Sequence, residues 1–135
     1  MNVTYRNNIK ISADQFIDVL RRSTLAERRP VDQRDRVEKM LLHGNIIITA
    51  WHSDLLIGVS RALSDFSFCC YLSDLAVDIA YQKQGIGKEL IKRTREVAGD
   101  NAMLLLLAAP AAVEYYPKIG MEQFTDCFII KRKTT

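Results

Sequence analysis

The stretch AYQKQGIGKEL, residues 80–90, places Gly85 and Gly87 one residue apart, between a strand-like run and a helix-like run. Neither glycine carries a side chain, so an anion could approach the backbone closely at this point. The helix predicted to begin near Gly85 would leave its first amide groups without intrahelical partners, and such groups bind anions. A plain turn with no ligand is the other interpretation, and two glycines alone do not decide between the two.

The loop differs from two better-known phosphate-binding patterns. A Walker loop requires G-x-x-x-x-G-K-[ST], and a dinucleotide-binding loop requires a third glycine and a later acidic residue. Residues 80–90 contain neither arrangement. Any anionic group bound here must therefore be held in another way.

The rest of the chain predicts a single α/β domain over residues 1–135, without a linker, low-complexity stretch or internal repeat. Strands are expected at 3–5, 46–52, 56–63, 66–77, 103–108, 121–124 and 127–131, from runs of apolar and β-favouring residues. Helices are expected after Ser12, from about residue 33, after Gly85, and from Pro110 to about Lys118. The order β-α-α-β-β-β-α-β-α-β-β implies a mixed central sheet flanked by about four helices.

The boundaries of these elements follow from particular residues. Ser12 and Gln15 form a capping-box pattern at the start of the first helix. Asp32 is the expected cap of the second helix, and Gly44 stands where a left-handed residue would end it. The run 103–108 is almost entirely apolar, as expected for a strand covered on both faces.

The composition argues against several classes of protein. With 48% hydrophobic residues the chain is too apolar to be disordered, and its net charge of +3 is too mild for a nucleic-acid-binding protein. Two histidines, and three cysteines without metal-ligand spacing, predict no metal site. The most apolar segment, 102–113, is too short to cross a membrane. The odd cysteine count and a polar N-terminus favour the cytoplasm.

A second motif lies in AAVEYYPKIGM, residues 111–121. Taken alone, two adjacent tyrosines are interpreted as core packing. Combined with the glycine loop and the preceding strand LSDLAVD, however, the stretch resembles the GCN5-related N-acetyltransferase (GNAT) superfamily. Gln82, Gly85 and Gly87 match its [RQ]-x-x-G-x-[GA] loop. Tyr115, Tyr116, Lys118 and Gly120 match its later aromatic-Tyr-x-[KR]-x-G-aromatic motif, in which Met121 stands in place of the last aromatic residue.

The resemblance implies a single-domain acyl-CoA N-acyltransferase fold and an acetyl-CoA-dependent N-acetyltransferase that needs no metal. The acetyl group would pass to a primary amine of a small molecule or peptide, by direct attack in a ternary complex. Tyr116 would be the catalytic general acid that protonates the leaving thiolate. The residues that the resemblance places around coenzyme A are Leu75, Ala76, Val77, Gln82, Lys83, Gln84, Gly85, Ile86, Gly87, Lys88 and Lys118.

The acceptor and the general base are less well defined. In the family the loop between the first two helices helps to build the acceptor pocket, so Arg28, Arg29 and Arg34 are candidates for binding an anionic group of the acceptor; solvated surface charge is the alternative. Tyr71 and Ser73 match positions of family bases, although neither side chain is a good base. Strict alternation along the strand would turn Asp74 away from them, unless a bulge re-aims it. A water chain, or an amine that arrives deprotonated, is the alternative to a protein base.

A non-catalytic module that binds or senses acyl-CoA fits the same residues. Many family members have Asn seven positions before the catalytic Tyr, where this chain has Ala109. That difference and the missing base favour the module, whereas the retained Tyr116 favours the enzyme. Many relatives dimerise through the end strands of the sheet, and the resemblance leaves both a monomer and a homodimer open.

Overall fold

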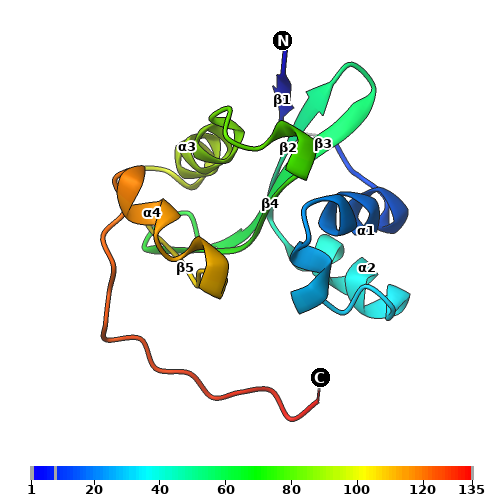
Figure 1. The fold of residues 1–135 in the computed structure, drawn as a ribbon. Coiled ribbons are helices and arrows are strands. Elements are labelled where there is room, and N and C mark those ends of the chain that lie inside the picture. The colour runs from blue at the N-terminus through cyan, green and yellow to red at the C-terminus, as the bar shows by residue number, and fades with distance from the viewer. Residues whose placement is uncertain (1, 8, 135) are drawn as a thin grey trace.

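The computed structural model describes residues 2–7 and 9–134 as a five-stranded mixed sheet flanked by helices, which confirms the predicted fold class (Figure 1). The strands lie in chain order across the sheet, β1-β2-β3-β4-β5. Their bounds are β1 Thr4–Arg6, β2 Ile46–His52, β3 Leu55–Ser64, β4 Cys69–Val77 and β5 Met103–Leu106. The helices are α1 Ala13–Arg22, α2 Arg34–His43, α3 Ile86–Ala98 and α4 Tyr115–Lys118, with 3-10 turns at Leu25–Arg28, Ile79–Tyr81 and Pro110–Ala112.

Neighbouring strands are antiparallel from β1 to β4, whereas β4 and β5 are parallel. The antiparallel strands β2, β3 and β4 follow one another through short turns. A parallel pair needs a crossover, and α3 supplies it between β4 and β5. The glycine loop therefore lies at the junction where the chain leaves the sheet after β4 and enters the crossover helix.

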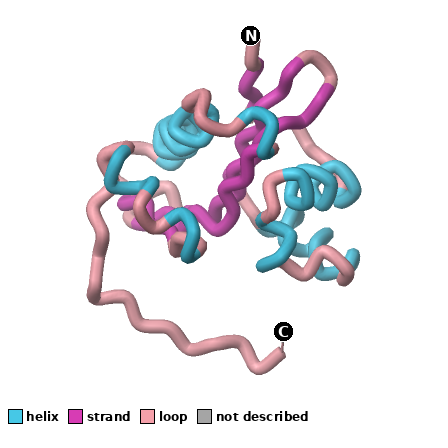
Figure 2. Tube along the Cα trace, in the orientation of Figure 1, coloured by secondary structure: helices cyan, strands magenta, loops and turns pink. Residues whose placement is uncertain are grey.

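The helices cover both faces of the sheet, with α1 and α2 on one side and α3 on the other (Figures 1 and 2). Phe16 and Leu20 of α1 and Val37 of α2 are fully buried in one apolar cluster. Leu90 of α3 is fully buried in a second cluster, together with Ile48 and Leu72 from the sheet. The two clusters share β3, so the sheet separates two apolar layers that must both form for the domain to be stable.

The caps of the helices were predicted with mixed success. Ser12 and Gln15 form the expected capping box, since each side chain accepts a hydrogen bond from the other residue's backbone amide. The residue at the start of α2 is Gln33, without a side-chain cap, so the prediction of Asp32 as the cap was wrong. Gly44 is not left-handed either: its φ is −76°, and an added Cβ would lie 2.8 Å from the Arg61 side chain. Glycine is required there for space rather than for a positive φ.

The predicted strands at 121–124 and 127–131 are absent, and this part of the fold prediction was wrong. Described residues 121–134 contain no helix or strand, and residues 122–134 are all exposed. A two-stranded ribbon is marginal in water unless a third strand or a packing face supports it, and in the described structure the segment pairs with no strand and all of residues 122–134 are exposed. The strand at 103–108 is also shorter than predicted, and Met103 and Leu105 leave one of its faces uncovered.

A single carboxylate organises the turn between β3 and β4. Asp65 Oδ1 accepts hydrogen bonds from the amides of Ser67, Phe68 and Cys69 at 2.8–3.0 Å. These bonds, with that from Cys69 the largest, hold the pKa of Asp65 at about 2. Because the ionised form accepts these bonds more strongly than the neutral form, they stabilise the turn most while Asp65 carries its charge.

We predict that Asp65→Asn removes a pH-dependent part of the stability. A depressed pKa contributes stability that is present above the unfolded value of about 3.9 and is lost as the pH falls through about 2. The difference in urea midpoint between wild type and Asp65→Asn should therefore shrink between pH 5 and pH 2. Asp54→Asn, in the turn between β2 and β3, is the matched control. A difference that stays constant with pH would contradict the role given to Asp65.

Candidate functional site

A β-bulge in β4 marks the centre of the candidate site. The pairing of β3 with β4 places Arg61 opposite Asp74 but Ala62 opposite Leu72, so Ser73 is an extra residue on β4. Before the bulge, Cys70 and Leu72 belong to the apolar cluster under α3; after it, Leu75 packs against that same cluster. The strict alternation predicted for this strand was therefore wrong, because the extra residue exchanges the faces.

The same point is where β4 and β5 separate. Their parallel pairing runs from Cys69↔Met103 to Leu72↔Leu106 and stops there. From Ser73 to Val77, β4 keeps β3 as its neighbour on one edge and has no strand partner among the described residues on the other. The predicted cofactor residues Leu75, Ala76 and Val77 lie on this open stretch. An extended ligand could hydrogen-bond to the free edge as a further strand would.

Two arginines hold Asp74 on the opposite face of the sheet. The carboxylate is fully buried, and each of its oxygens pairs with one guanidinium, from Arg29 and Arg61. Arg29 Nη2 also donates to the Ser73 carbonyl oxygen at 2.7 Å, and Arg61 Nη2 donates to Ser73 Oγ at 3.1 Å. A third bond, from Arg61 Nη1 to the Met40 carbonyl oxygen, ties α2 to the bulge. Charge-assisted bonds from two separate parts of the chain thus fix the bulge, and Arg61 connects it to a third part, α2.

This network changes the roles expected of several residues. Asp74 faces two cations and is sealed from solvent, so it is not a candidate general base. The Arg29 guanidinium, considered as an acceptor-binding group, is engaged with β4 instead. Ser73 uses its hydroxyl and carbonyl oxygens to bind the two arginines. Tyr71, by contrast, is 37% exposed on β4, and Arg28 contributes only its carbonyl oxygen to a hydrogen bond with Arg29.

The glycine loop presents the start of α3 as predicted. Gly85 is the first residue before the helix and is left-handed at φ 81°, and Lys83 is also left-handed at φ 65°. Because Gly85 has no side chain, it cannot cap the helix, and the first intrahelical bond runs from Glu89 N to the Gly85 carbonyl. The amides of Ile86, Gly87 and Lys88 precede that bond and have no intrahelical acceptor. Gln82 folds back, and its Nε2 donates to the Val77 carbonyl oxygen at 2.9 Å.

The two tyrosines lie beside this loop, although they come from residues about thirty positions later. An added Cβ on Gly87 would lie 3.0 Å from the Tyr115 hydroxyl oxygen and 3.9 Å from Leu75. Tyr116 packs against the cluster that contains Leu72 and Ile86, and its ring meets that of Tyr115 edge to face at 5.2 Å. The structure therefore gathers the end of β4, the start of α3 and α4 around one region.

Burial raises the pKa of both phenols, and for Tyr116 the neighbouring Tyr115 raises the pKa further. A raised pKa means that the phenol keeps its proton above the ordinary value of about 10. Tyr116 is therefore protonated throughout the neutral range, which is the state that a proton donor requires.

Sequence reasoning missed Arg61 and assigned Arg29 to another role. Arg61 lies in an otherwise apolar strand, and Arg29 lies in a loop. Only the structure shows that both pair with Asp74. A single polar residue in the middle of a buried strand is the one signal available, because a buried charge requires an opposite charge. Arg61 stands in such a run, with Ile57, Val59 and Ala62 buried around it.

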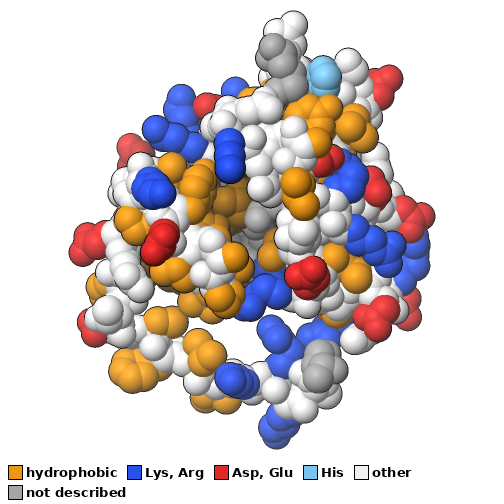
Figure 3. Space-filling model, viewed as in Figure 1, with side chains coloured by type: hydrophobic (Ala, Val, Ile, Leu, Met, Phe, Trp, Pro, Cys, Tyr) orange, Lys and Arg blue, Asp and Glu red, His pale blue; other side chains and the backbone are white. Residues whose placement is uncertain are grey.

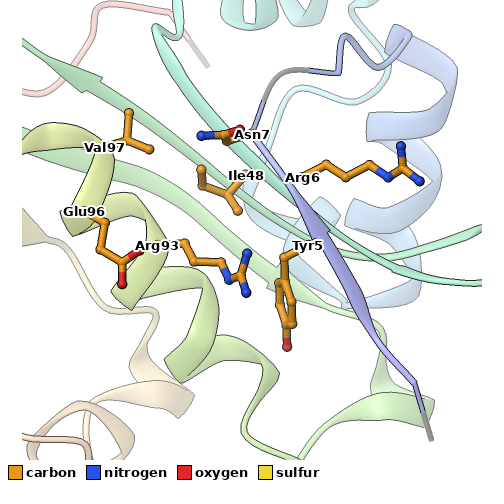
Figure 4. Close-up of a pocket in the computed structure, with 7 residues that line it drawn as sticks. All are labelled: Tyr5, Arg6, Asn7, Ile48, Arg93, Glu96 and Val97. Carbon is orange, nitrogen blue, oxygen red and sulfur yellow. The ribbon is translucent and has the colours of Figure 1, made fainter.

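A small pocket of about 120 Å³ lies elsewhere, between β1 and α3 (Figure 4). Arg93 reaches across it, with its guanidinium carbon 4.5 Å from the centre of the Tyr5 ring and its Nε 2.8 Å from Glu89. The residues from α3 belong to the middle and end of that helix, whereas the glycine loop forms its start. The pocket is therefore separate from the candidate site.

The comparisons with known proteins identify the family. The sequence model of the acetyltransferase (GNAT) domain matches residues 20–129, so the chain belongs to the GNAT acetyltransferase family. Histone acetyltransferase TAP1 of Glycine max is 39% identical over 69 residues, which cover 50% of this chain and 30% of the relative. The curated relatives are thus matched over 27% to 56% of their own length.

Solved structures share the fold. A GNAT-family acetyltransferase of Streptococcus pneumoniae superimposes with a TM-score of 0.79 at 21% identity, covering 98% of both chains. A predicted acetyltransferase of Clostridium acetobutylicum, solved with acetyl-CoA, superimposes with a TM-score of 0.78 at 13% identity over 96% of both chains. None of the helices in the described part of the chain is long and apolar enough to span a membrane.

We predict that the Asp74 network is necessary for folding. Removing one partner of a buried ion pair costs about 3–5 kcal/mol, and Asp74→Ala would leave two guanidinium groups without their carboxylate. Asp18→Ala is the control, since Asp18 forms an exposed pair with Arg22 four residues away, worth about 0.5 kcal/mol or less. Urea unfolding measures both free energies. Equal losses of unfolding free energy in the two variants would show that the buried pair stabilises the fold no more than the exposed pair does.

Proposed function

We propose that this chain is an N-acetyltransferase that moves the acetyl group of acetyl-CoA to a primary amine of a small molecule or peptide, by direct attack in a ternary complex. The observation that carries the proposal is the separation of β4 from β5 at the Ser73 bulge, directly beside the uncapped start of α3. Family membership supports it, and so does the acetyl-CoA bound in the Clostridium acetobutylicum structure of the same fold.

The residues present fit a coenzyme A pyrophosphate at the glycine loop. No heavy atom lies within 4 Å of an added Cβ on Gly85, so the backbone there faces open space. The free amides at the start of α3 and the positive end of its dipole favour an anion. The charges of Lys83 and Lys88 act in the same direction. We assign the pyrophosphate to residues 82–88, with Lys118 contributing a further positive charge from α4.

The open edge of β4 would bind and polarise the acyl group. Acetyl-CoA supplies a thioester, whose carbonyl carbon is the electrophile. Backbone amides of residues 75–77 would donate to the carbonyl oxygen as negative charge develops on it, and prepositioned donors of this kind stabilise such charge strongly. The arginine network holds this segment from the other face, so the donors need not reorganise during the reaction.

Tyr116 would supply the proton that the leaving thiolate takes. The amine nitrogen forms a bond to the carbonyl carbon, the bond from carbon to sulfur breaks, and the phenolic proton passes to sulfur. The proton lost by the amine passes to water and restores the phenol. Since Asp74 is held by two arginines, we propose that the amine reaches the site already deprotonated or loses its proton through water. We assign no residue of this chain to bind an anionic group on the acceptor.

We predict that Gly87→Ala weakens coenzyme A binding at least tenfold, about 1.4 kcal/mol, because the new methyl group points toward Leu75 and Tyr115 at the proposed site. Alanine otherwise favours a helix by about 1 kcal/mol, so the fold tolerates the exchange. Thermal shift against coenzyme A concentration measures the affinity.

The double variant Gly87→Ala/Tyr115→Phe separates two explanations of this effect. Tyr115→Phe removes the hydroxyl that the new methyl group would meet at 3.0 Å. If the glycine serves the pyrophosphate, the double variant stays weak. Restored affinity would show that Gly87 only makes room for Tyr115, and the assigned binding loop would be wrong.

We predict that Tyr116→Phe lowers kcat at least tenfold with little change in the affinity for acetyl-CoA, since general acid catalysis contributes about 10² to 10⁴ in rate. Steady-state turnover on pooled amines measures kcat. Tyr115→Phe, which keeps an aromatic ring and leaves the proposed acid in place, is the matched control and should keep kcat within about twofold. Unchanged turnover in Tyr116→Phe would remove it from the mechanism.

A non-catalytic acyl-CoA-binding module is the alternative that the same assays decide. Two features favour the module. Ala109 stands where many family members have Asn, and Asp74 is paired with arginines and so does not serve as a base. Wild-type chain that is stabilised by coenzyme A and acetyl-CoA but transfers no acetyl group to any pooled amine would establish the module. We propose the cytoplasm as the location, with neither nucleic acid nor membrane as a partner.

A further inference from the structure

Arg22 is the last residue of α1, and its guanidinium joins three segments of the chain. Its Nε donates to Asp18 Oδ2 at 3.0 Å, its Nη1 donates to Asp78 Oδ2, and its Nη2 donates to the Leu56 carbonyl oxygen. Asp18 lies in α1, Leu56 in β3, and Asp78 directly after β4. The exposed fractions of the Arg22 and Asp78 side chains are only 25% and 11%, so solvent and salt screen this ion pair less than a surface pair.

Asp78 is the residue at which the chain leaves the sheet. It follows β4 and precedes the 3-10 turn Ile79–Tyr81, which leads to the glycine loop. Its amide donates to the Ile57 carbonyl oxygen at 2.8 Å, and its Oδ1 accepts from the Ala80 amide at 2.8 Å. The first bond ties Asp78 to β3, the second begins the turn, and Oδ2 binds Arg22. Together these bonds fix the direction of the chain between β4 and the glycine loop.

The open edge of β4, residues 75–77, is anchored at both ends by ion pairs. Asp74 precedes it and is held by Arg29, and Asp78 follows it and is held by Arg22. Both arginines come from α1 and the turn directly after it. Figure 1 shows α1 on one side of β4 and α3 on the other, and hydrophobic side chains line a hollow between the two helices (Figure 3). The segment of α1 therefore supports the edge along its whole length.

We propose that Arg22, acting through Asp78, is a positioning residue that sets the distance and angle between two half-sites for coenzyme A. We define the acyl half-site as residues 75–77, which would bind the pantetheine arm and its thioester, and the phosphate half-site as residues 82–88. This role rests on the proposed function, because that function assigns both segments to one ligand.

The half-sites are close enough for one ligand to reach both. An added Cβ on Gly87 in the phosphate half-site would lie 3.9 Å from the Leu75 side chain in the acyl half-site. Once one part of a ligand is bound, its other part binds at a high effective concentration, provided that the second half-site is held at the matching separation. Loss of the Arg22 contact would leave each half-site in place but release the joint between them. Whole coenzyme A would then bind less tightly, while a fragment that occupies one half-site would bind as before.

The affinities for coenzyme A and for ADP give the first test, since ADP carries a pyrophosphate without the pantetheine arm. For Arg22→Gln and for Asp78→Asn, which keeps an oxygen for the Ala80 amide, we expect the dissociation constant of coenzyme A to rise about tenfold or more. That of ADP should stay within about twofold. NMR titration of the backbone amides measures both constants and shows that each variant is folded.

Two control variants separate positioning from loss of charge and loss of stability. Arg21→Gln removes the same charge from an exposed position of α1, and Val37→Ala removes buried methyl groups from the apolar cluster that α1 shares with α2. Both should keep the wild-type ratio of the two dissociation constants, although Val37→Ala lowers the urea midpoint. Equal weakening of coenzyme A and ADP in Arg22→Gln, unchanged affinity for coenzyme A, or a changed ratio in Val37→Ala would each overturn the proposal.

Hydrogen exchange on the free chain tests the joint without a ligand. The amides of Asp78 and Ala80 donate the bonds that fix the turn, and we expect both to exchange about tenfold faster or more in Arg22→Gln than in Arg21→Gln. Equal exchange in the two variants would refute the positioning role whatever the affinity for coenzyme A. A wild-type chain that binds no coenzyme A would instead overturn the proposed function, and the two half-sites with it, even if exchange at Asp78 is faster in Arg22→Gln.

Discussion

The buried carboxylate of Asp74 is the interaction on which the rest of this structure depends. It joins Arg61 of β3, Arg29 of the segment between α1 and α2, and through Arg61 the end of α2. A buried ion pair is weak evidence of net stability, because desolvation of both partners offsets their attraction. The ion pairs of Asp74 have a direct geometric effect: three segments far apart in sequence must meet at one point of β4. That point is the Ser73 bulge.

The bulge explains why the candidate site lies where it does. Ser73 is the extra residue opposite β3, and its two oxygens are bound by the arginines that hold Asp74. Beyond it β4 is no longer paired with β5, and it exposes an edge that an ordinary sheet would pair. α3 begins at Ile86, nine residues after β4 ends, and its first turn returns to within contact distance of Leu75. A bare strand edge and a bare helix start are therefore neighbours. Both offer backbone amides to a ligand, and neither depends on a specific side chain.

This arrangement explains which features the sequence could predict. The capping box at Ser12, the start of a helix at Gly85 and the crossover α3 depend on residues close together in the chain, and all were predictable. The bulge was not, because alternation assumes one residue per partner, and Ser73 breaks that rule only when Arg29 and Arg61 supply the extra bonds. Gly44 shows the same limit: its glycine is explained by the Arg61 side chain rather than by its own φ. Long-range partners decided each of these cases.

The C-terminal segment, residues 121–134, shows a different limit. Residues 127–131 have the composition of a strand, and the prediction of strand character is consistent with an extended backbone; the partner is what is missing. Composition records how readily a segment pairs, but it does not record whether the folded chain offers that segment an edge. The uncovered face of β5 makes the point from the other side, since an all-apolar run such as Met103–Leu106 implies a covered strand. Both errors have one physical cause: composition indicates a partner for each segment, and the described residues supply none.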